Sequence, residues 1–270
     1  AIIGISPSQG ARSPKLWNRV YKKVNTETRM ICLDVEKKNF LKLMKYLNKD
    51  KNFIGGAITN PYKESIFKYL RTNIDKTSKK IGSINCIYRK KDKLYGTNTD
   101  GEGAILSLKK LGPIINKKFL ILGTGGTSLS VTSYLTKYVN ENEKILIAGR
   151  NRLKLNIFKK KFNCSTCLIK DLKENIKDLD FVINCTDVGS INKKNQFILT
   201  NEHFKIFKKS VKIFDVIYNP LKTPLLKLAN KNKKLNRNGL DMNFYQAIYA
   251  FMKVNEINIK NFKKISSLMK

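Results

Sequence analysis

Short runs of β-branched and other apolar residues alternate along the chain with longer stretches of helical periodicity, and this alternation limits the possible folds more than any other feature. The strand-like runs AIIGI, TRMICLDV and FIGGAIT are separated by the amphipathic stretches SPKLWNRVYKKV and KNFLKLMKYLNK. Parallel strands need such helical connections, so the pattern predicts βαβ units and a mostly parallel sheet. SINCIYRKKDKLYGTNTD follows and is typical of a hairpin that turns at KKDK and closes a first domain.

A second domain is indicated by the segment that follows this hairpin. GEGAILSLKKLG has helical spacing, KKFLILGTGGTSLSVTSYLTKYV predicts a strand, a glycine turn and a helix, and KILIAGR, DFVINCT and VKIFDVIY predict further strands. GLDMNFYQAIYAFMKVNEI has apolar residues at helical spacing and is expected to pack back on the first domain. We therefore expect an α/β protein with a first domain at 1–102, completed by C-terminal helices at 239–270, and a Rossmann domain at 103–238.

The glycine turn predicts a nucleotide site. Gly123, Gly125, Gly126 and Thr127 stand where a buried strand turns into a helix. Glycines there allow a tight turn and the close approach of backbone amides to a pyrophosphate, which the helix N-terminus attracts. Ser128 replaces the third glycine of the usual GxGxxG pattern, so a plain strand-to-helix turn remains the alternative.

The strand after this turn indicates which dinucleotide is bound. In an NAD site, an acidic residue at its end would bind the ribose 2′-hydroxyl group, but here the strand runs into Arg150, Arg152 and Lys154. Cations at this position suit a 2′-phosphate. The sequence therefore favours NADP as the cofactor.

The strong positive charge has two interpretations. The chain of 270 residues carries 54 Lys and Arg against 20 Asp and Glu, a formal net charge of +34. Such a charge suits a nucleic acid or another anionic partner. However, the lysines are spread over the whole chain together with abundant Asn and Ile, which indicates a general bias in composition and no specific nucleic-acid site.

The cysteines and the apolar runs indicate the compartment. Five cysteines are an odd number for a disulfide framework and favour a reducing cytoplasm. CSTC at 164–167 has CxxC spacing, but His203 is the only histidine and there is no second CxxC, so we expect a structural role and no metal site. No apolar run is long enough to cross a bilayer, so we expect a soluble protein with no membrane partner.

Eight short motifs, taken in order, resemble those of the shikimate dehydrogenase family. They are RSP at 12–14, GGAITNPYK at 55–63, IGSINCI at 81–87, GTNTDGEG at 96–103, LGTGGTS at 122–128, INCTDVGS at 183–190, FDVIYNPLKTPLL at 214–226 and GLDMNFYQA at 239–247. The resemblance covers nearly the whole chain. It implies that the first domain binds the substrate and that the Rossmann domain binds NADP.

The resemblance also implies a catalytic pair, Lys63 and Asp100, which face each other in this family and act on the substrate oxygen. Hydride reduction of a ketone places negative charge on its oxygen. A positioned ammonium can stabilise and protonate that oxygen, while a carboxylate holds the ammonium in place. Asp100 is also suited to cap the helix that follows it, and the two roles are compatible.

Further site residues follow from the same resemblance. A small polyhydroxylated acid needs several neutral hydrogen-bond groups, because each hydroxyl group must be paired after it loses water. The substrate residues implied are Ser13, Thr59, Asn85, Tyr218 and Gln246. Thr186 and Gly239 are implied as cofactor residues beside those named above.

The first motif departs from the family pattern. The family usually has G-x-P-x-x-H-S-x-S-P, whereas GISPSQGARSP is one residue longer and has Ala11 in place of the first serine. The lost hydrogen bond to the substrate carboxylate could be replaced by Ser8, Gln9 or Arg12. Ala57, Gly149 and Asp241 are further departures outside this motif, and none of them removes the expected catalytic pair.

The expected activity is the reversible NADPH-dependent reduction of 3-dehydroshikimate to shikimate, by a monomer or homodimer. A quinate/shikimate dehydrogenase that uses NAD is the nearest alternative. A basic nucleic-acid-binding protein on a dehydrogenase scaffold is the alternative from another class. A scaffold freed from catalysis has no need of Lys63 with Asp100, which argues against the latter.

Overall fold

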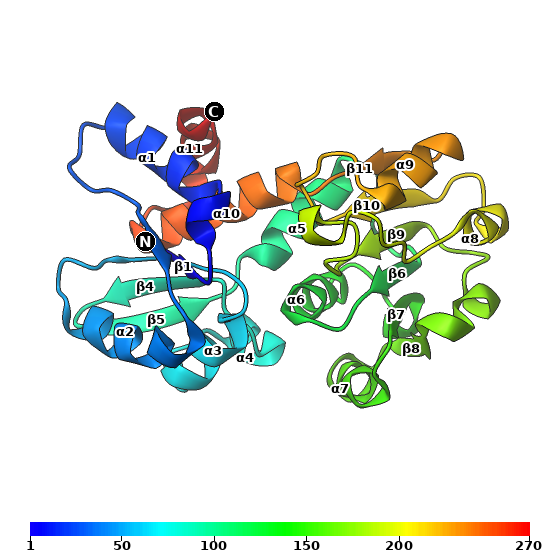
Figure 1. Cartoon of the computed structure of the whole chain (residues 1–270), viewed down its shortest axis with the longest axis horizontal. Coiled ribbons are helices and arrows are strands. Elements are labelled where there is room, and N and C mark those ends of the chain that lie inside the picture. Colours follow the sequence, from blue (N-terminus) through cyan, green and yellow to red (C-terminus); the bar gives the residue numbers. More distant parts are fainter. The chain divides into compact units, whose positions relative to one another are not determined.

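The structure is a computed structural model that describes all residues from 1 to 270, and its contacts divide the chain into two compact units. The first unit contains residues 1–100 and 244–270, and the second contains residues 101–243. Each unit is built around its own sheet (Figure 1). No helix is both long enough and apolar enough to cross a lipid bilayer.

The sheet of the first unit has five strands in the order β2-β1-β3-β4-β5. β1, β2 and β3 run parallel, whereas β4 pairs antiparallel with both of its neighbours, so the sheet is mixed. Its strands are β1 Ile2–Gly4, β2 Cys32–Asp34, β3 Gly55–Ile58, β4 Cys86–Lys90 and β5 Lys93–Thr97. The hairpin expected around KKDK is β4 and β5, with Lys91 at a φ of 53° in its turn.

Helices cover both faces of this sheet. The α-helices of the first unit are α1 Ser13–Lys23, α2 Lys37–Lys49, α3 Lys63–Leu70, α4 Lys76–Ile81, α10 Leu240–Val254 and α11 Phe262–Met269. Only the part of α10 from residue 244 on belongs to this unit. The 3₁₀ helices are η1 Pro7–Gln9 and η5 Ile259–Asn261. α1 buries Trp17, whose ring lies edge-on to Phe251 of α10 at 5.3 Å and whose Nε1 donates to the carbonyl of Ala247 at 3.1 Å. The C-terminal helices therefore share an apolar core with α1.

One strand of the first unit is shorter than expected. The run TRMICLDV predicts a strand of eight residues, yet β2 contains only Cys32–Asp34. Met30 instead exchanges two hydrogen bonds with the side-chain amide of Asn18, at 2.7 and 3.0 Å, so its backbone groups are already paired. Local pairing to a helix side chain thus takes the place of the sheet ladder there.

The second unit contains a fully parallel sheet of six strands in the order β11-β10-β9-β6-β7-β8. Its strands are β6 Phe119–Leu122, β7 Ile145–Gly149, β8 Ser165–Leu168, β9 Phe181–Asn184, β10 Lys212–Asp215 and β11 Asn236–Arg237. Numbered within the unit, this is the 3-2-1-4-5-6 order of a Rossmann sheet. The α/β class and the Rossmann domain expected from the sequence are confirmed.

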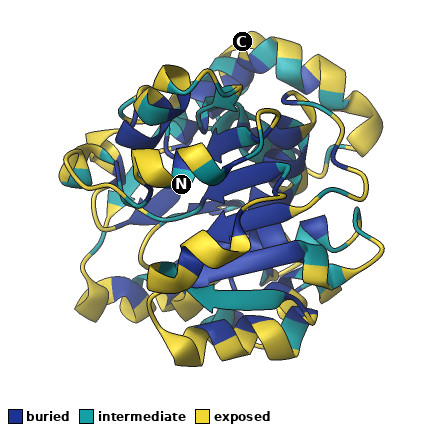
Figure 2. Ribbon diagram, turned by 90° about the vertical axis from the view of Figure 1, so that its right-hand side faces the viewer, coloured by how far each residue is buried: buried dark blue, intermediate teal, exposed yellow.

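The helices that connect these strands cover both faces of the sheet, because the strands of a parallel sheet are apolar on both sides and must be buried. The helices are α5 Asp100–Lys109, α6 Gly126–Leu135, α7 Arg152–Phe162, α8 Asn201–Ile206 and α9 Pro224–Lys231, with 3₁₀ turns η2 Asn142–Lys144, η3 Ile169–Asn175 and η4 Ile191–Lys193. Phe119 and Ile121 of β6 belong to one apolar cluster, and Leu120 and Leu122 belong to another. In Figure 2 the strands are largely buried, while the outer helix faces are exposed.

Candidate active site

Lys63 and Asp100 form an ion pair in the first unit. Lys63 is the first residue of α3, Asp100 is the first residue of α5, and Nζ lies 2.5 Å from Oδ2. The side chains are only 17% and 8% exposed, so water screens the pair weakly. The pairing expected from the sequence is therefore present: an ammonium group is held by a nearly buried carboxylate.

The side-chain amide of Asn85, which directly precedes β4, holds the other oxygen of this carboxylate. Its Nδ2 lies 2.7 Å from Oδ1 of Asp100, 3.0 Å from Oγ1 of Thr99 and 3.2 Å from Oε1 of Gln246 on α10. Its Oδ1 accepts the backbone N–H of Thr99 at 2.8 Å. Four of the predicted residues, Lys63, Asp100, Asn85 and Gln246, thus meet in one hydrogen-bonded cluster.

The backbone around Lys63 is fixed by contacts on both sides. Its carbonyl accepts the N–H of Ile84 at 3.0 Å, which ties the start of α3 to the segment before Asn85. Tyr62 stacks on Phe40 with ring centroids 4.2 Å apart, and its hydroxyl group donates to the carbonyl of Val35. The backbone from which the Lys63 side chain extends is therefore held in place, which limits the directions in which its ammonium group can point.

Two residues that the sequence reasoning did not assign, Asn98 and Thr99, support the cluster. Asn98 accepts the N–H of Asp100 at 3.1 Å and donates to the carbonyl of Ser83 at 2.9 Å. Thr99 donates from its hydroxyl to the carbonyl of Gln246 at 3.0 Å, besides its bonds with Asn85. Both stand in the motif GTNTDGEG, and the signal that could have identified them is a run of buried polar residues directly after a strand.

The other predicted substrate residues are Thr59, Ser13 and Tyr218. Thr59 lies directly after β3, where its N–H donates to the carbonyl of Ile3 at 2.9 Å, and Ser13 is the buried first residue of α1. Tyr218 lies after β10 in the second unit and is half-buried. Their roles in substrate binding stay predictions.

The altered first loop is anchored by Ser8. Its backbone N–H donates to Oδ1 of Asp34 at 3.0 Å, and its hydroxyl group donates to Oδ2. These bonds hold the pKa of the Asp34 carboxyl below its ordinary value. Ser8 is thus engaged in fixing the loop to the end of β2, and the side-chain amide of Gln9 donates to the Ser8 hydroxyl group at 3.3 Å. Which of Ser8, Gln9 and Arg12 replaces the lost serine stays a prediction.

In the second unit, the glycine turn lies at the point where the strand order reverses. β6 and β9 are neighbours in the sheet; the chain continues from β6 to β7 on one side and from β9 to β10 on the other. Open α/β sheets bind ligands at the carboxyl ends of two such strands. Gly123 follows β6 with a φ of +107°, and a Cβ atom there would lie 2.9 Å from Cγ2 of Thr186, which follows β9. Gly123 and Thr186, both predicted cofactor residues, are therefore in contact.

The N-terminus of α6 has room for a phosphate group. A Cβ atom added at Gly125 would meet nothing within 4 Å, and the first helical residues, Gly126, Thr127 and Ser128, have backbone N–H groups that the helix itself cannot pair. The hydroxyl group of Ser128 is buried and has no hydrogen-bond partner. Free donors, an unpaired hydroxyl and open space fit a pyrophosphate.

The three predicted cationic residues, Arg150, Arg152 and Lys154, lie together at the turn from β7 to α7, and all are exposed. Asn151 caps α7 by accepting the N–H of Lys154 at 3.1 Å, so the turn is ordered. The next acidic residue along the chain is Asp171. The turn itself thus contains cations and no carboxylate.

Cys164 and Cys167 lie on opposite faces of the second sheet. Cys164 belongs to the cluster with Phe119, whereas Cys167 packs against the cluster with Leu120. Burial raises the pKa of each thiol to about 11. The CxxC spacing thus places its two thiols against different apolar clusters.

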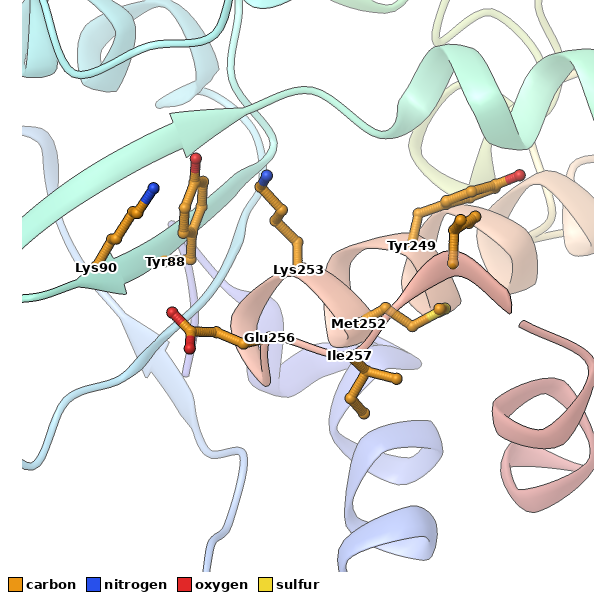
Figure 3. A pocket seen from close by; sticks show the side chains of 8 residues that line it. Tyr88, Lys90, Tyr249, Met252, Lys253, Glu256 and Ile257 are labelled. Carbon is orange, nitrogen blue, oxygen red and sulfur yellow. The ribbon is translucent and has the colours of Figure 1, made fainter. Parts of the chain in front are cut away.

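A separate pocket of about 390 Å³ lies at the C-terminal end of α10 (Figure 3). Its lining combines two lysines, one glutamate, two tyrosines and three apolar side chains: Tyr88, Lys90, Tyr249, Met252, Lys253, Glu256, Ile257 and Ile259. The ammonium of Lys253 lies 4.8 Å from the ring centre of Tyr88. None of the predicted site residues lines this pocket, and its mixed charge selects no particular ligand.

Comparison with known proteins identifies the family. Residues 2–87 match the model of the shikimate dehydrogenase substrate binding domain, and residues 106–220 match the model of shikimate / quinate 5-dehydrogenase. The shikimate dehydrogenase (NADP(+)) of Methanosphaera stadtmanae is 34% identical over 259 residues, which cover 93% of this chain and 88% of the relative. That of Methanococcus maripaludis is 35% identical over 262 residues, which cover 93% and 90%.

Solved structures agree with this result. A shikimate dehydrogenase in complex with NADP⁺ superposes with a TM-score of 0.84 at 28% identity, over 99% of this chain and 93% of the other. The shikimate dehydrogenase of Aquifex aeolicus gives a TM-score of 0.83 at 26% identity, over 98% and 96%. The resemblance read from the eight motifs is confirmed, and this chain belongs to the shikimate dehydrogenase family.

Proposed function

We propose that this chain is an NADP-dependent shikimate dehydrogenase, which reversibly reduces 3-dehydroshikimate to shikimate. The observation that carries the proposal is the ion pair of Lys63 and Asp100, held beside the amides of Asn85 and Gln246. The named relatives and the NADP⁺ complex of a homologue support the same activity and cofactor.

Lys63 is the proton donor in this proposal. When NADPH is bound, it supplies the hydride that reaches the carbonyl carbon. Negative charge then develops on the carbonyl oxygen, and the ammonium of Lys63 stabilises that charge and transfers one proton to it. In the oxidation of shikimate, the neutral amine of Lys63 takes the hydroxyl proton back.

Asp100 orients the lysine. Its Oδ2 accepts from Nζ, while its Oδ1 is held by Asn85, so the carboxylate cannot rotate away from the ammonium. A catalytic group that is already oriented before the substrate arrives needs less reorganisation in the transition state. Asn85 and Gln246, beside the pair, are placed to bind hydroxyl groups of the substrate.

The cofactor fits the second unit at the glycine turn and the cationic turn. The N–H groups at the start of α6 and the hydroxyl of Ser128 would hold the pyrophosphate, and Arg150, Arg152 and Lys154 would hold the 2′-phosphate. Gly239 and Thr186 complete the predicted set. This arrangement favours NADP over NAD, because only NADP carries the 2′-phosphate.

The setting of the enzyme is part of the proposal. All five cysteines are free thiols, as a reducing cytoplasm favours. Both the substrate and the cofactor are anionic, so the net charge of +34 attracts them to the protein. The positive charge therefore does not require a nucleic acid as the partner. We propose a cytoplasmic monomer or homodimer.

A steady-state assay tests the function. The purified chain is given shikimate or quinate, each with NADP⁺ or NAD⁺, and formation of the reduced cofactor is followed by its absorbance. The proposal predicts the highest kcat/KM with shikimate and NADP⁺. Preference for quinate with NAD⁺ would support the nearest alternative, and no turnover with any pair would contradict both.

A further inference from the structure

Two neighbouring strands of the second unit end in polar side chains that face each other. Asn184 is the last residue of β9, Asp215 is the last residue of β10, and the two are partners in the register of the sheet. Both are fully buried. A buried carboxylate is costly unless donors surround it, so its presence at the ligand-binding edge of the sheet needs a reason.

The carboxylate of Asp215 binds both ends of the loop that follows β10. Oδ1 accepts the N–H of Ile217 at 3.1 Å, and Oδ2 accepts the hydroxyl of Thr223 at 2.6 Å. Oδ1 also accepts from Nδ2 of Asn184 at 3.1 Å. All three donors are neutral, and the two carboxylate oxygens together join residues 217 and 223 of one loop to the neighbouring strand.

Asn184 extends the same network to the loop after β9. Its Oδ1 accepts the N–H of Thr186 at 3.0 Å and the hydroxyl of Thr186 at 2.7 Å, and its Nδ2 lies 3.2 Å from the carbonyl of Val188. Thr186 in turn is the residue whose methyl group faces Gly123 at the glycine turn. The position of Thr186 is therefore set through Asn184.

The two loops also contact each other and Gly239. A Cβ atom at Gly189 would lie 3.4 Å from Cβ of Thr223, so the loops pack closely there. The N–H of Gly239 donates to the carbonyl of Ile217 at 3.0 Å. Thr186 and Gly239, both predicted cofactor residues, thus rest on backbone that the network under Asp215 fixes.

We propose that Asp215 is a positioning residue for the coenzyme: its buried carboxylate holds the loops after β9 and β10 in the arrangement that binds NADP. The inference rests on the proposed function, since it assumes that NADP binds at this edge of the sheet. A carboxylate is suited to the role because it accepts on both oxygens, whereas an asparagine side chain has one acceptor and would present its amide donors to Thr223 or Asn184. Burial raises the pKa of Asp215 to about 6, in accord with its neutral surroundings.

The test compares Asp215→Asn with a matched variant at the opposite end of the same sheet. Asp180 directly precedes β9 and also has two anchored oxygens, one accepting from Lys208 Nζ at 2.7 Å and one from the Lys118 N–H at 2.8 Å. NADP⁺ affinity is measured by calorimetry without substrate, and the melting temperature is measured alongside. We expect Asp215→Asn to weaken NADP⁺ binding by about 10-fold, the loss of roughly one good hydrogen bond, and Asp180→Asn to leave it within about twofold of the wild type.

Thr223 gives a second pair of variants that does not alter the carboxylate. Thr223→Val keeps the volume but removes the hydroxyl donor, whereas Thr223→Ser keeps the donor. We expect weaker NADP⁺ binding for the valine variant and near wild-type binding for the serine variant. If Asp215→Asn does not fold, this pair decides the matter.

The outcomes separate this inference from the proposed function. A wild-type chain that binds no NADP⁺ contradicts the proposed function and the inference together. A wild-type chain that binds NADP⁺, with unchanged affinity in folded Asp215→Asn or in Thr223→Val, contradicts only the inference. Shikimate binding without cofactor serves as a further readout, which we expect to be unchanged in all of these variants.

Discussion

The ammonium nitrogen of Lys63 lies 2.5 Å from Oδ2 of Asp100, although the two residues begin different helices, 37 residues apart in the chain. The other carboxylate oxygen is bound by the amide of Asn85 at 2.7 Å. The protein's own side chains therefore orient the pair, as a proton-transfer site requires.

The glycine turn can be tested by two alanine substitutions that separate folding from cofactor binding. Gly125→Ala meets no atom within 4 Å, so it should leave the melting temperature nearly unchanged, but its methyl group enters the space assigned to the pyrophosphate. We expect its KM for NADP⁺ to rise about 10-fold or more, since backbone approach to the phosphates is blocked. Kinetics and thermal melting check this.

Gly123→Ala is the matched control for that substitution. Gly123 has a φ of +107° and close neighbours, so alanine there is strained and should lower the free energy of unfolding by roughly 1–3 kcal/mol. An unchanged KM for NADP⁺ in Gly125→Ala would mean that the pyrophosphate lies elsewhere.

The choice of NADP over NAD should depend on Arg150. Arg150→Gln removes a cation from the turn after β7, so KM for NADP⁺ should rise about 10-fold or more while KM for NAD⁺ changes little, because only NADP⁺ carries the 2′-phosphate. Lys160→Gln, an equal change of charge on an exposed residue of the same helix, is the control and should affect neither. Equal effects of Arg150→Gln on both cofactors would assign the arginine a structural role.

The stability of the chain should depend on pH through Asp215. Its pKa in the folded protein is about 6, above the ordinary value of 3.8, so the folded state binds the proton more tightly than the unfolded chain. The contribution of this group to stability is therefore complete below about pH 4 and is lost as the pH rises to about 6, by roughly 3 kcal/mol. Asp215→Asn has no such group, so its free energy of unfolding relative to the wild type should increase across this range.

Denaturant unfolding of both proteins at several pH values measures this difference. Other carboxyl groups titrate in both proteins and cancel in the comparison. A difference that stays constant between about pH 4 and pH 7 would show that Asp215 is not protonated more readily in the folded state.

The sequence predicted the elements with strong periodicity better than the details at their ends. The second sheet could be predicted because its strands are short apolar runs between helices, and Gly123 marks its turn by residue type alone. The mixed pairing of the first sheet depends on β4 running antiparallel to both β3 and β5. The late start of β2 depends on Asn18, a side chain on another element. Such contacts leave no local pattern.

The same limit applies to the site. Lys63 and Asp100 could be named from their motifs and from the chemistry of ketone reduction. Asn98 and Asp215 could not be assigned, because each is defined by what it binds: Asn98 by the Asp100 N–H, and Asp215 by the Thr223 hydroxyl. A buried polar residue at a strand end is a signal of such a role only once the strands have been placed side by side.

The turnover of Lys63→Ala tests the central claim most directly. Lys63 is proposed to act on the transition state more than on the bound substrate, so kcat for shikimate oxidation should fall by about 10²–10⁴-fold, while calorimetric shikimate binding and the melting temperature change little. Lys68→Ala, an exposed lysine on the same helix, should retain wild-type kcat. A Lys63→Ala enzyme that keeps a kcat close to that of the wild type would contradict the account.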